Sequence, residues 1–218
     1  MTDVIRLTDT AAFADLGRYA ARARALDAEG AIRLQCTGDV LAAWVGVLPG
    51  SGILGEGTVL GLRTFALGEP AELDAVVPLG AVTDRTARAG TDLAVPPNRA
   101  LAAWAAVTPP RSGWERAGEV GGDELARVGK EGIAEVSAAV RDRGAAAGFL
   151  KEQVWARPVP VSRDAGDTEA SGSAGEVRAG GALAAYALGF LRPGTPIAVF
   201  RCNRWTRLSG PGGHVLMR

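Results

Sequence analysis

A short run in the first half of the chain alternates apolar and polar residues and then turns back on itself. Apolar residues occupy every second position from Ile32 to Cys36, with polar residues between them. This period of two is typical of a strand that buries one face. The tripeptide Thr37-Gly38-Asp39 suits a tight turn, and the nearly all-apolar run Val40–Leu48 follows it. The pattern therefore predicts an antiparallel hairpin, and with it a β-sheet in this part of the chain.

A helix is expected before the hairpin. Thr8 or Asp9 can cap it, apolar residues then recur at helical spacing to about Ala28, and Gly30 ends it. Two strands and a brief helix are predicted after the hairpin, at Thr58–Leu67, at Ala75–Pro78 and in the residues that lead up to Gly90.

Two consecutive prolines, Pro109-Pro110, interrupt the chain near its middle. Neither a helix interior nor a central strand tolerates such a pair, so the segment predicts a junction. We therefore divide the chain into an N-terminal part, residues 1–110, and a C-terminal part, residues 111–218. Trp114 follows the junction, where its side chain could fix the junction in place by packing or contribute to an interface.

The C-terminal part is predicted to be mostly helical. We expect helices at Gly122–Arg143, at about Ala145–Trp155 and at Ala182–Leu191, a mobile loop at residues 162–181, and short strands from Ile197 to Arg218. The fold class predicted is α+β. An N-terminal helix with an antiparallel sheet is followed by C-terminal helices and a terminal β-hairpin.

Composition bounds the class of protein. The charged fraction is 22%, the apolar fraction is 47% and the net charge is zero, as in a soluble globular protein. No apolar run approaches the roughly 20 residues of a membrane-spanning helix, and no secretory signal is visible, so we expect a cytoplasmic protein. Cys36 and Cys202 suffice neither for a disulfide framework nor for a zinc site. No metal and no cofactor is expected.

Charge is unevenly distributed along the chain. The last acidic residue is Glu176, so the final 42 residues carry six arginines and no acid, and the first 176 residues carry a net charge of −6. This asymmetry suits an anionic partner, or acids elsewhere in the same molecule. Nucleic acid is not the expected partner, because the whole chain is neutral with a pI of about 6.6.

Two letter patterns that resemble phosphate-binding loops lack the required context. The segment Gly50–Gly55 fits the glycine spacing of dinucleotide-binding folds, but a predicted strand follows it where a helix is needed. Gly129-Lys130 lacks both the earlier glycine and the following Ser or Thr of a P-loop. We interpret the first as a hairpin connection and the second as helix surface.

His214 is the only histidine, so acid–base chemistry near neutral pH needs it or a carboxylate with a shifted pKa. A nucleophile such as Cys36, Cys202 or Ser209 would have to be brought to it by the fold. No nucleophile-elbow or cysteine-protease signature occurs in the sequence. We favour a structural histidine in a turn or a strand.

The segment Arg201–Arg207 carries the main candidate site. In one continuous strand, Arg201, Trp205 and Arg207 would share a face with Asn203, where guanidinium groups could hold a phosphate beside an indole. A turn at Cys202-Asn203-Arg204 would remove this shared face. We favour a charged edge strand as the interpretation. The candidate ligand-binding residues are Arg201, Arg204, Trp205, Arg207 and His214.

Three segments carry a resemblance: TPPRSGWE at Thr108–Glu115, GIAEV at Gly132–Val136 and RWTRLSGPGGHVL at Arg204–Leu216. With these segments the chain resembles a family of uncharacterised actinobacterial proteins. The resemblance covers most of the chain and implies a taxonomic origin. It implies no activity, ligand or catalytic residue.

Two functional hypotheses follow from these observations. The favoured one is a non-catalytic protein that acts by self-association, as a homodimer, or by binding a partner. The alternative is binding of a small anionic ligand, a nucleotide or phosphorylated metabolite, through the C-terminal Arg/Trp strand. We lean against an enzyme, although a catalytic site assembled only in three dimensions stays open. No membrane association is expected.

Overall fold

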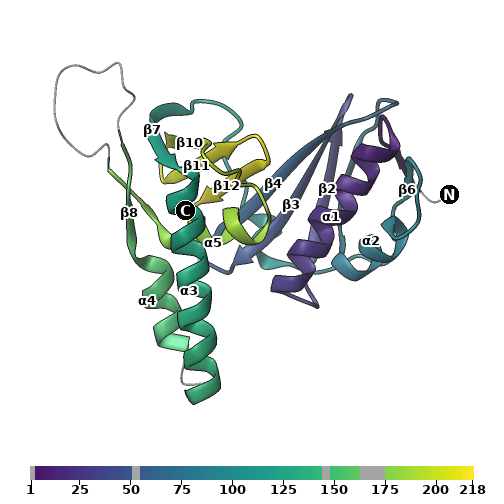
Figure 1. Ribbon diagram of the computed structural model, residues 1–218. Helices are drawn as coiled ribbons and strands as arrows, with labels where there is room; N and C mark the ends of the chain where they lie inside the picture. The colour runs from purple at the N-terminus through teal and green to yellow at the C-terminus, as the bar shows by residue number, and fades with distance from the viewer. Residues whose placement is uncertain (1–2, 51–54, 144–147, 163–174) are drawn as a thin grey trace. The chain divides into compact units, whose positions relative to one another are not determined.

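The computed structural model describes residues 3–50, 55–143, 148–162 and 175–218 (Figure 1). The chain divides into two compact units, Met1–Thr108 and Pro109–Arg218. This boundary lies two residues before the division expected from the double proline. Each unit contains antiparallel strands and helices.

An antiparallel sheet forms the first unit. Its strands, in spatial order, are β5 (Leu73–Pro78), β2 (Ala31–Thr37), β3 (Val40–Leu48) and β4 (Val59–Ala66). The predicted hairpin is confirmed, because β2 pairs with β3 and only Gly38 and Asp39 lie between them. Gly38 has a φ of +56°, the left-handed conformation that such turns need and glycine adopts without strain.

Helix α1 (Thr10–Leu26) covers one face of this sheet. The Asp9 side chain accepts a hydrogen bond from the Ala12 amide at 2.8 Å, so Asp9 is the cap. Tyr19 is fully buried, and its hydroxyl donates to the carbonyl of Ala43 in β3 at 3.4 Å. The short helix α2 (Leu79–Thr86) packs beside α1, where Gly17 lies against Thr86.

Three short elements of this unit were not predicted. They are strand β1 (Val4–Arg6), its partner β6 (Asp92–Ala94) and the 3-10 helix η1 (Ala103–Ala106). The two strands are three residues long and each buries a single side chain, Ile5 or Leu93. One buried residue produces no periodicity, so pairing across the fold specifies these strands.

Antiparallel strands also pair with one another within the second unit. Their order is β7 (Glu115–Gly121), β10 (Pro196–Cys202), β11 (Trp205–Gly210) and β12 (Gly213–Met217). The terminal hairpin was predicted, whereas β7 was not. β7 contains three glycines or alanines among charged residues, and Val120 is its only large buried side chain.

In the described residues of the second unit the helices are α3 (Gly122–Arg143), α4 (Gly148–Ala156) and α5 (Ala179–Ala187). The bounds of α3 are those predicted. Helix α5 lies on the sheet, because Gly181 is packed against Met217 of β12 and Leu208 of β11. It begins three residues earlier than expected, and Gly189, with a φ of +73°, follows its end.

The mobile loop predicted at residues 162–181 is partly wrong. Residues 163–174 lie outside the described residues. The described remainder is ordered, since β9 (Glu176–Arg178) pairs with β8 (Pro158–Pro160) and α5 follows it directly. Val177 faces Val159 in this ribbon, and both are buried. A single valine in a Ser/Gly-rich segment carries too little local signal to reveal a strand.

The predicted α+β class is confirmed, with helices on antiparallel sheets in both units. The candidate loop Gly50–Gly55 has its residues 51–54 outside the described residues, and the strand β4 follows it as predicted. Within the described part of the chain, no helix has the length and apolar character that crossing a bilayer requires.

Candidate functional site

One face of the second sheet gathers aromatic and cationic side chains. Strand register places Phe200 of β10 opposite Arg207 of β11, and Ser209 of β11 opposite His214 of β12. Arg207 and Ser209 are two positions apart and point to the same side, while the intervening Leu208 points to α5. Together with Trp114, these side chains form what we call the Arg207 face: Trp114, Phe200, Arg207, Ser209 and His214.

The guanidinium of Arg207 lies between two aromatic rings. Its central carbon is 4.6 Å from the ring centre of Trp114 and 4.6 Å from that of Phe200. The Trp114 indole is held in place by its own hydrogen bond, in which Nε1 donates to the carbonyl of Pro110 at 3.0 Å. Both rings therefore present their negative π faces to the cation, each contributing about 0.5–2 kcal/mol in general.

No carboxylate neutralises Arg207 within the described residues. The acid on the same side of β7 is Glu119, which lies 3.6 Å from Arg116. The Nε atom of Arg207 is enclosed and has no hydrogen-bond partner. Burial lowers the pKa of Arg207 below its ordinary value, because a desolvated cation is less stable than a hydrated one. The Arg207 face thus holds a positive charge that has no counter-ion among the described residues.

His214 and Ser209 form a hydrogen-bonded pair beside this cation. The distance from His214 Nδ1 to Ser209 Oγ is 3.0 Å. Burial, and secondly the positive charge of Arg207, lower the pKa of His214 below its ordinary value. His214 is therefore neutral at physiological pH and retains a hydrogen-bonding nitrogen.

The Ser209–His214 pair has the spacing of a nucleophile and a general base. A general base must accept a proton, and the adjacent Arg207 opposes the imidazolium that would result. In a catalytic triad a carboxylate stabilises that imidazolium, and none contacts His214 among the described residues. The electrostatics of this pair therefore favour hydrogen bonding to a ligand over activation of the serine.

The continuous strand considered for Arg201–Arg207 is wrong. β10 ends at Cys202 and β11 begins at Trp205, with Asn203 and Arg204 forming the turn. Asn203 has a φ of +52°, a conformation that asparagine adopts more readily than most residues. This is the turn that the sequence left open as the alternative at Cys202-Asn203-Arg204.

Because of this turn, the predicted site residues lie on opposite sides of the hairpin and in the turn itself. Arg201 points to the side opposite Arg207, and its Nη2 donates to the carbonyl of Glu176 at 3.0 Å. Arg204 is exposed in the turn. Trp205 lies on the Arg207 side of β11 but is only 6% exposed, with the Arg218 guanidinium 5.9 Å from its ring centre. Of the five candidates, Arg207 and His214 are brought together.

Phe200 and Ser209 were missing from the predicted ligand-binding residues, and Trp114 was singled out only as a junction residue. Phe200 precedes the turn by three residues, and only the hairpin register reveals that it faces Arg207. Trp114 is 93 positions from Arg207 in the sequence, so no local pattern connects them. Ser209 had been considered only as a possible nucleophile for His214.

The described residues contain no group of three or more His, Cys, Asp or Glu side chains that could hold a metal ion. Both cysteines are free thiols, and burial raises the pKa of Cys36 to about 11. A thiol with so high a pKa is protonated at neutral pH and is a poor nucleophile or metal ligand. The candidate site is therefore built from Arg207 and its neighbours alone.

Family models match both halves of the chain. Residues 1–106 match a Domain of unknown function (DUF8010), and residues 109–218 match another Domain of unknown function (DUF8185). No curated protein and no solved structure matches the chain. These findings confirm the resemblance to a family without an assigned activity, and the actinobacterial origin stays a prediction. Because the second model spans half of its residues, the chain belongs to the family of the Domain of unknown function DUF8185.

Proposed function

We propose that the chain is a binding protein without catalytic activity and that its C-terminal unit holds a small anionic ligand at the Arg207 face. The class proposed is a phosphate-bearing metabolite, either a nucleotide or a sugar phosphate. The observation that carries the proposal is the Arg207 guanidinium, which is held between Trp114 and Phe200 with no carboxylate partner among the described residues.

The energetics of the cation support an anionic ligand. A partly buried charge without a counter-ion costs free energy, which the aromatic faces offset only in part. Each ring centre lies 4.6 Å from the guanidinium carbon, and the guanidinium N–H groups supply the donors for an anionic acceptor. Phosphate and carboxylate oxygens fit these donors in a bidentate manner, with shorter and stronger hydrogen bonds than neutral acceptors.

The neighbouring polar groups favour the same class of ligand. Ser209 and neutral His214 lie beside Arg207 and share one hydrogen bond, so the pair keeps one further N–H or O–H that can donate to a ligand oxygen. The final 42 residues contain no acid that would repel an anion. A bound anion would also oppose the effect of Arg207 on His214, and so raise the pKa of the imidazole.

The single histidine provides a direct test, because its imidazole NMR signals report on the site without overlap. The full chain is titrated with inorganic phosphate, a nucleoside monophosphate, a sugar phosphate and the uncharged nucleoside. We expect saturable shifts of the His214 signals with the phosphate-bearing compounds and none with the nucleoside. Relative affinities distinguish the nucleotide from the sugar phosphate.

Arg207→Gln removes the charge and keeps a hydrogen-bonding side chain. We expect it to weaken binding at least about tenfold, the equivalent of 1.4 kcal/mol. Arg201→Gln is the matched control, because it removes an arginine from the opposite side of the same hairpin. Absence of any saturable shift at millimolar concentrations, or equal losses in the two variants, refutes the proposal.

The non-catalytic part of the proposal has its own test. Ser209 should not react with a fluorophosphonate probe, since His214 beside Arg207 is a weakened base. Labelling of wild-type protein that is lost in Ser209→Ala would instead identify an activated serine and an enzyme. Changing Cys36 and Cys202 to alanine should likewise leave ligand binding intact, because neither thiol belongs to the Arg207 face.

A cytoplasmic location is proposed as well. It is supported by the two free thiols, since oxidising compartments favour disulfides. Fractionation of the native host with an antibody to the chain tests it, and recovery from the membrane or secreted fraction contradicts it.

A further inference from the structure

We infer that the C-terminal half of α3 is a docking surface for an amphipathic helix of another protein, one that carries acidic side chains along one side. The apolar residues of α3 that face in one direction are Leu125, Gly129, Ile133, Val136 and Val140, spaced three or four positions apart. Such a stripe in a helix of a globular protein is normally buried along its whole length.

Burial decreases along this stripe toward the end of the helix. Leu125 is fully buried and Gly129 is buried, whereas Ile133 and Val136 are half-buried and Val140 is 51% exposed. The reason is the length of the covering helix. α5 has nine residues against the 22 of α3, and its Tyr186, near its own end, packs against Gly129 and remains 39% exposed.

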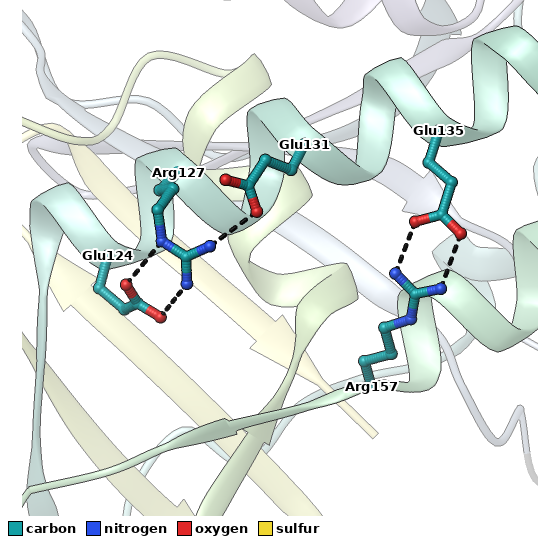
Figure 2. Close-up of polar contacts among 5 residues, drawn as sticks. All are labelled: Glu124, Arg127, Glu131, Glu135 and Arg157. Carbon is teal, nitrogen blue, oxygen red and sulfur yellow. Dashed lines mark hydrogen bonds and ion pairs between the residues drawn. The ribbon is translucent and has the colours of Figure 1, made fainter.

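The polar side of α3 and one flank of the stripe already have partners within the described chain. On its polar side Arg127 binds Glu124 and Glu131, at 2.6 Å and 2.7 Å (Figure 2). Next to the stripe on one flank, Glu135 forms a two-bond ion pair with Arg157 at 2.6 Å and 2.7 Å. The α4 residue Trp155 is packed against Gly132 on this flank.

The other flank of the stripe is basic and unpaired. Lys130 follows Gly129, and Arg141 follows Val140, so the two cations are eleven positions, or about three turns, apart on the same side of the helix. Both are exposed, and neither has an ion pair with the described residues. A helix that covers Ile133, Val136 and Val140 would be complementary to this flank if it carried acidic side chains beside Lys130 and Arg141.

These charges distinguish a different protein from a second copy of the chain. In an antiparallel pair related by a two-fold axis, the same flank of both helices lies on one side, so Lys130 and Arg141 of the two copies would repel each other. In a parallel pair this flank would meet the opposite one, which α4 and the Glu135–Arg157 ion pair already fill. A partner helix of about three turns with an acidic flank meets neither obstacle.

The test uses the full chain and two synthetic helical peptides of about three turns. Both carry leucines at helical spacing, and they differ only in having Glu or Lys along one flank. We expect the Glu peptide to bind at least about tenfold more tightly at low salt, to lose this preference at high salt, and to shift the methyl signals of Val136 and Val140.

Two variants sharpen the test. The double change Lys130→Glu with Arg141→Glu should reverse the peptide preference, and Val140→Asp should abolish binding. Phe149→Asp is the matched control, because Phe149 is an exposed apolar residue of α4, 71% exposed, outside the stripe. Equal affinities for the two peptides overturn the inference. A dimer in native mass measurements that Val140→Asp dissociates overturns it as well, since the occupant is then a second copy.

Discussion

Arg33 in the first unit and Arg207 in the second are partly buried arginines on antiparallel strands, β2 and β11. Arg33 is paired with a carboxylate: its Nε and Nη2 donate to Asp74 at 2.7 Å and 2.6 Å, and its Nη1 donates to the carbonyl of Ala105 at 3.0 Å. Arg207 has two aromatic rings in place of the carboxylate, and its Nε has no hydrogen-bond partner among the described residues.

The same residue type consequently has opposite pKa shifts in the two units. The hydrogen bond to Asp74 raises the pKa of Arg33, and burial lowers the pKa of Arg207. Arg33 therefore has a carboxylate partner within the first unit, whereas Arg207 has none among the described residues and bears a desolvation cost. A difference of this kind locates a candidate site without any catalytic motif.

The largest effect is expected when the pair in the first unit is broken. Asp74→Ala leaves Arg33, whose side chain is only 20% exposed, without its counter-ion, and should destabilise the chain by about 2 kcal/mol. Denaturant unfolding measures the change. An effect below about 0.5 kcal/mol would show that solvent replaces Asp74 and that the contrast between the two arginines is weaker than described.

Replacing each arginine by methionine sharpens the comparison. Arg33→Met should destabilise the protein by about 1 kcal/mol, because three hydrogen bonds of its guanidinium are lost. Arg207→Met removes a desolvated cation and keeps an apolar chain between Trp114 and Phe200, so it should be neutral or slightly stabilising. Equal losses of stability in the two variants would indicate that Arg207 stabilises the fold as much as Arg33 does.

The smallest effect expected is a pH dependence that belongs to His214. Its folded pKa lies below the ordinary value of 6.5, so as the pH falls the unfolded chain takes up the proton first. The stability linked to this group is therefore fully present above pH 6.5 and is lost as the pH falls toward the folded pKa.

Thermal unfolding of wild type and His214→Gln between pH 7.5 and pH 5 measures this linkage, and the wild type alone should lose stability as the pH falls. His214 is the only histidine, so no second imidazole interferes. Saturating phosphate should reduce the difference between the two proteins. A wild-type profile as flat as that of the variant would place His214 in water, away from Arg207.

Elements with a strong local signal were predictable. The β2–β3 hairpin follows from period-two alternation around a glycine turn, α1 from a cap at Thr8 or Asp9, and α3 from apolar residues at helical spacing between Leu125 and Val140. Each of these signals lies within the element itself, so the rest of the fold is not needed to interpret it.

Elements specified by distant partners could not be predicted in the same way. β7 and β9 each contain one large buried residue, and they are strands because β10 and β8 offer them hydrogen bonds. The candidate site belongs to this group. The arginine-rich terminal segment was recognised, but the turn at Asn203 decides that Arg201 and Arg207 face opposite ways.

By itself, the sequence determined the α+β class, the main helices, both hairpins and the concentration of arginines near the C-terminus. These depend on the order of residue types along the chain, through periodicity, capping and turn chemistry. Only the tertiary structure decided that Trp114 and Phe200 enclose Arg207, that His214 meets Ser209, and that no carboxylate of the described residues pairs with that arginine. Strand register and burial set these contacts between residues up to 93 positions apart, and short-range sequence patterns do not encode them.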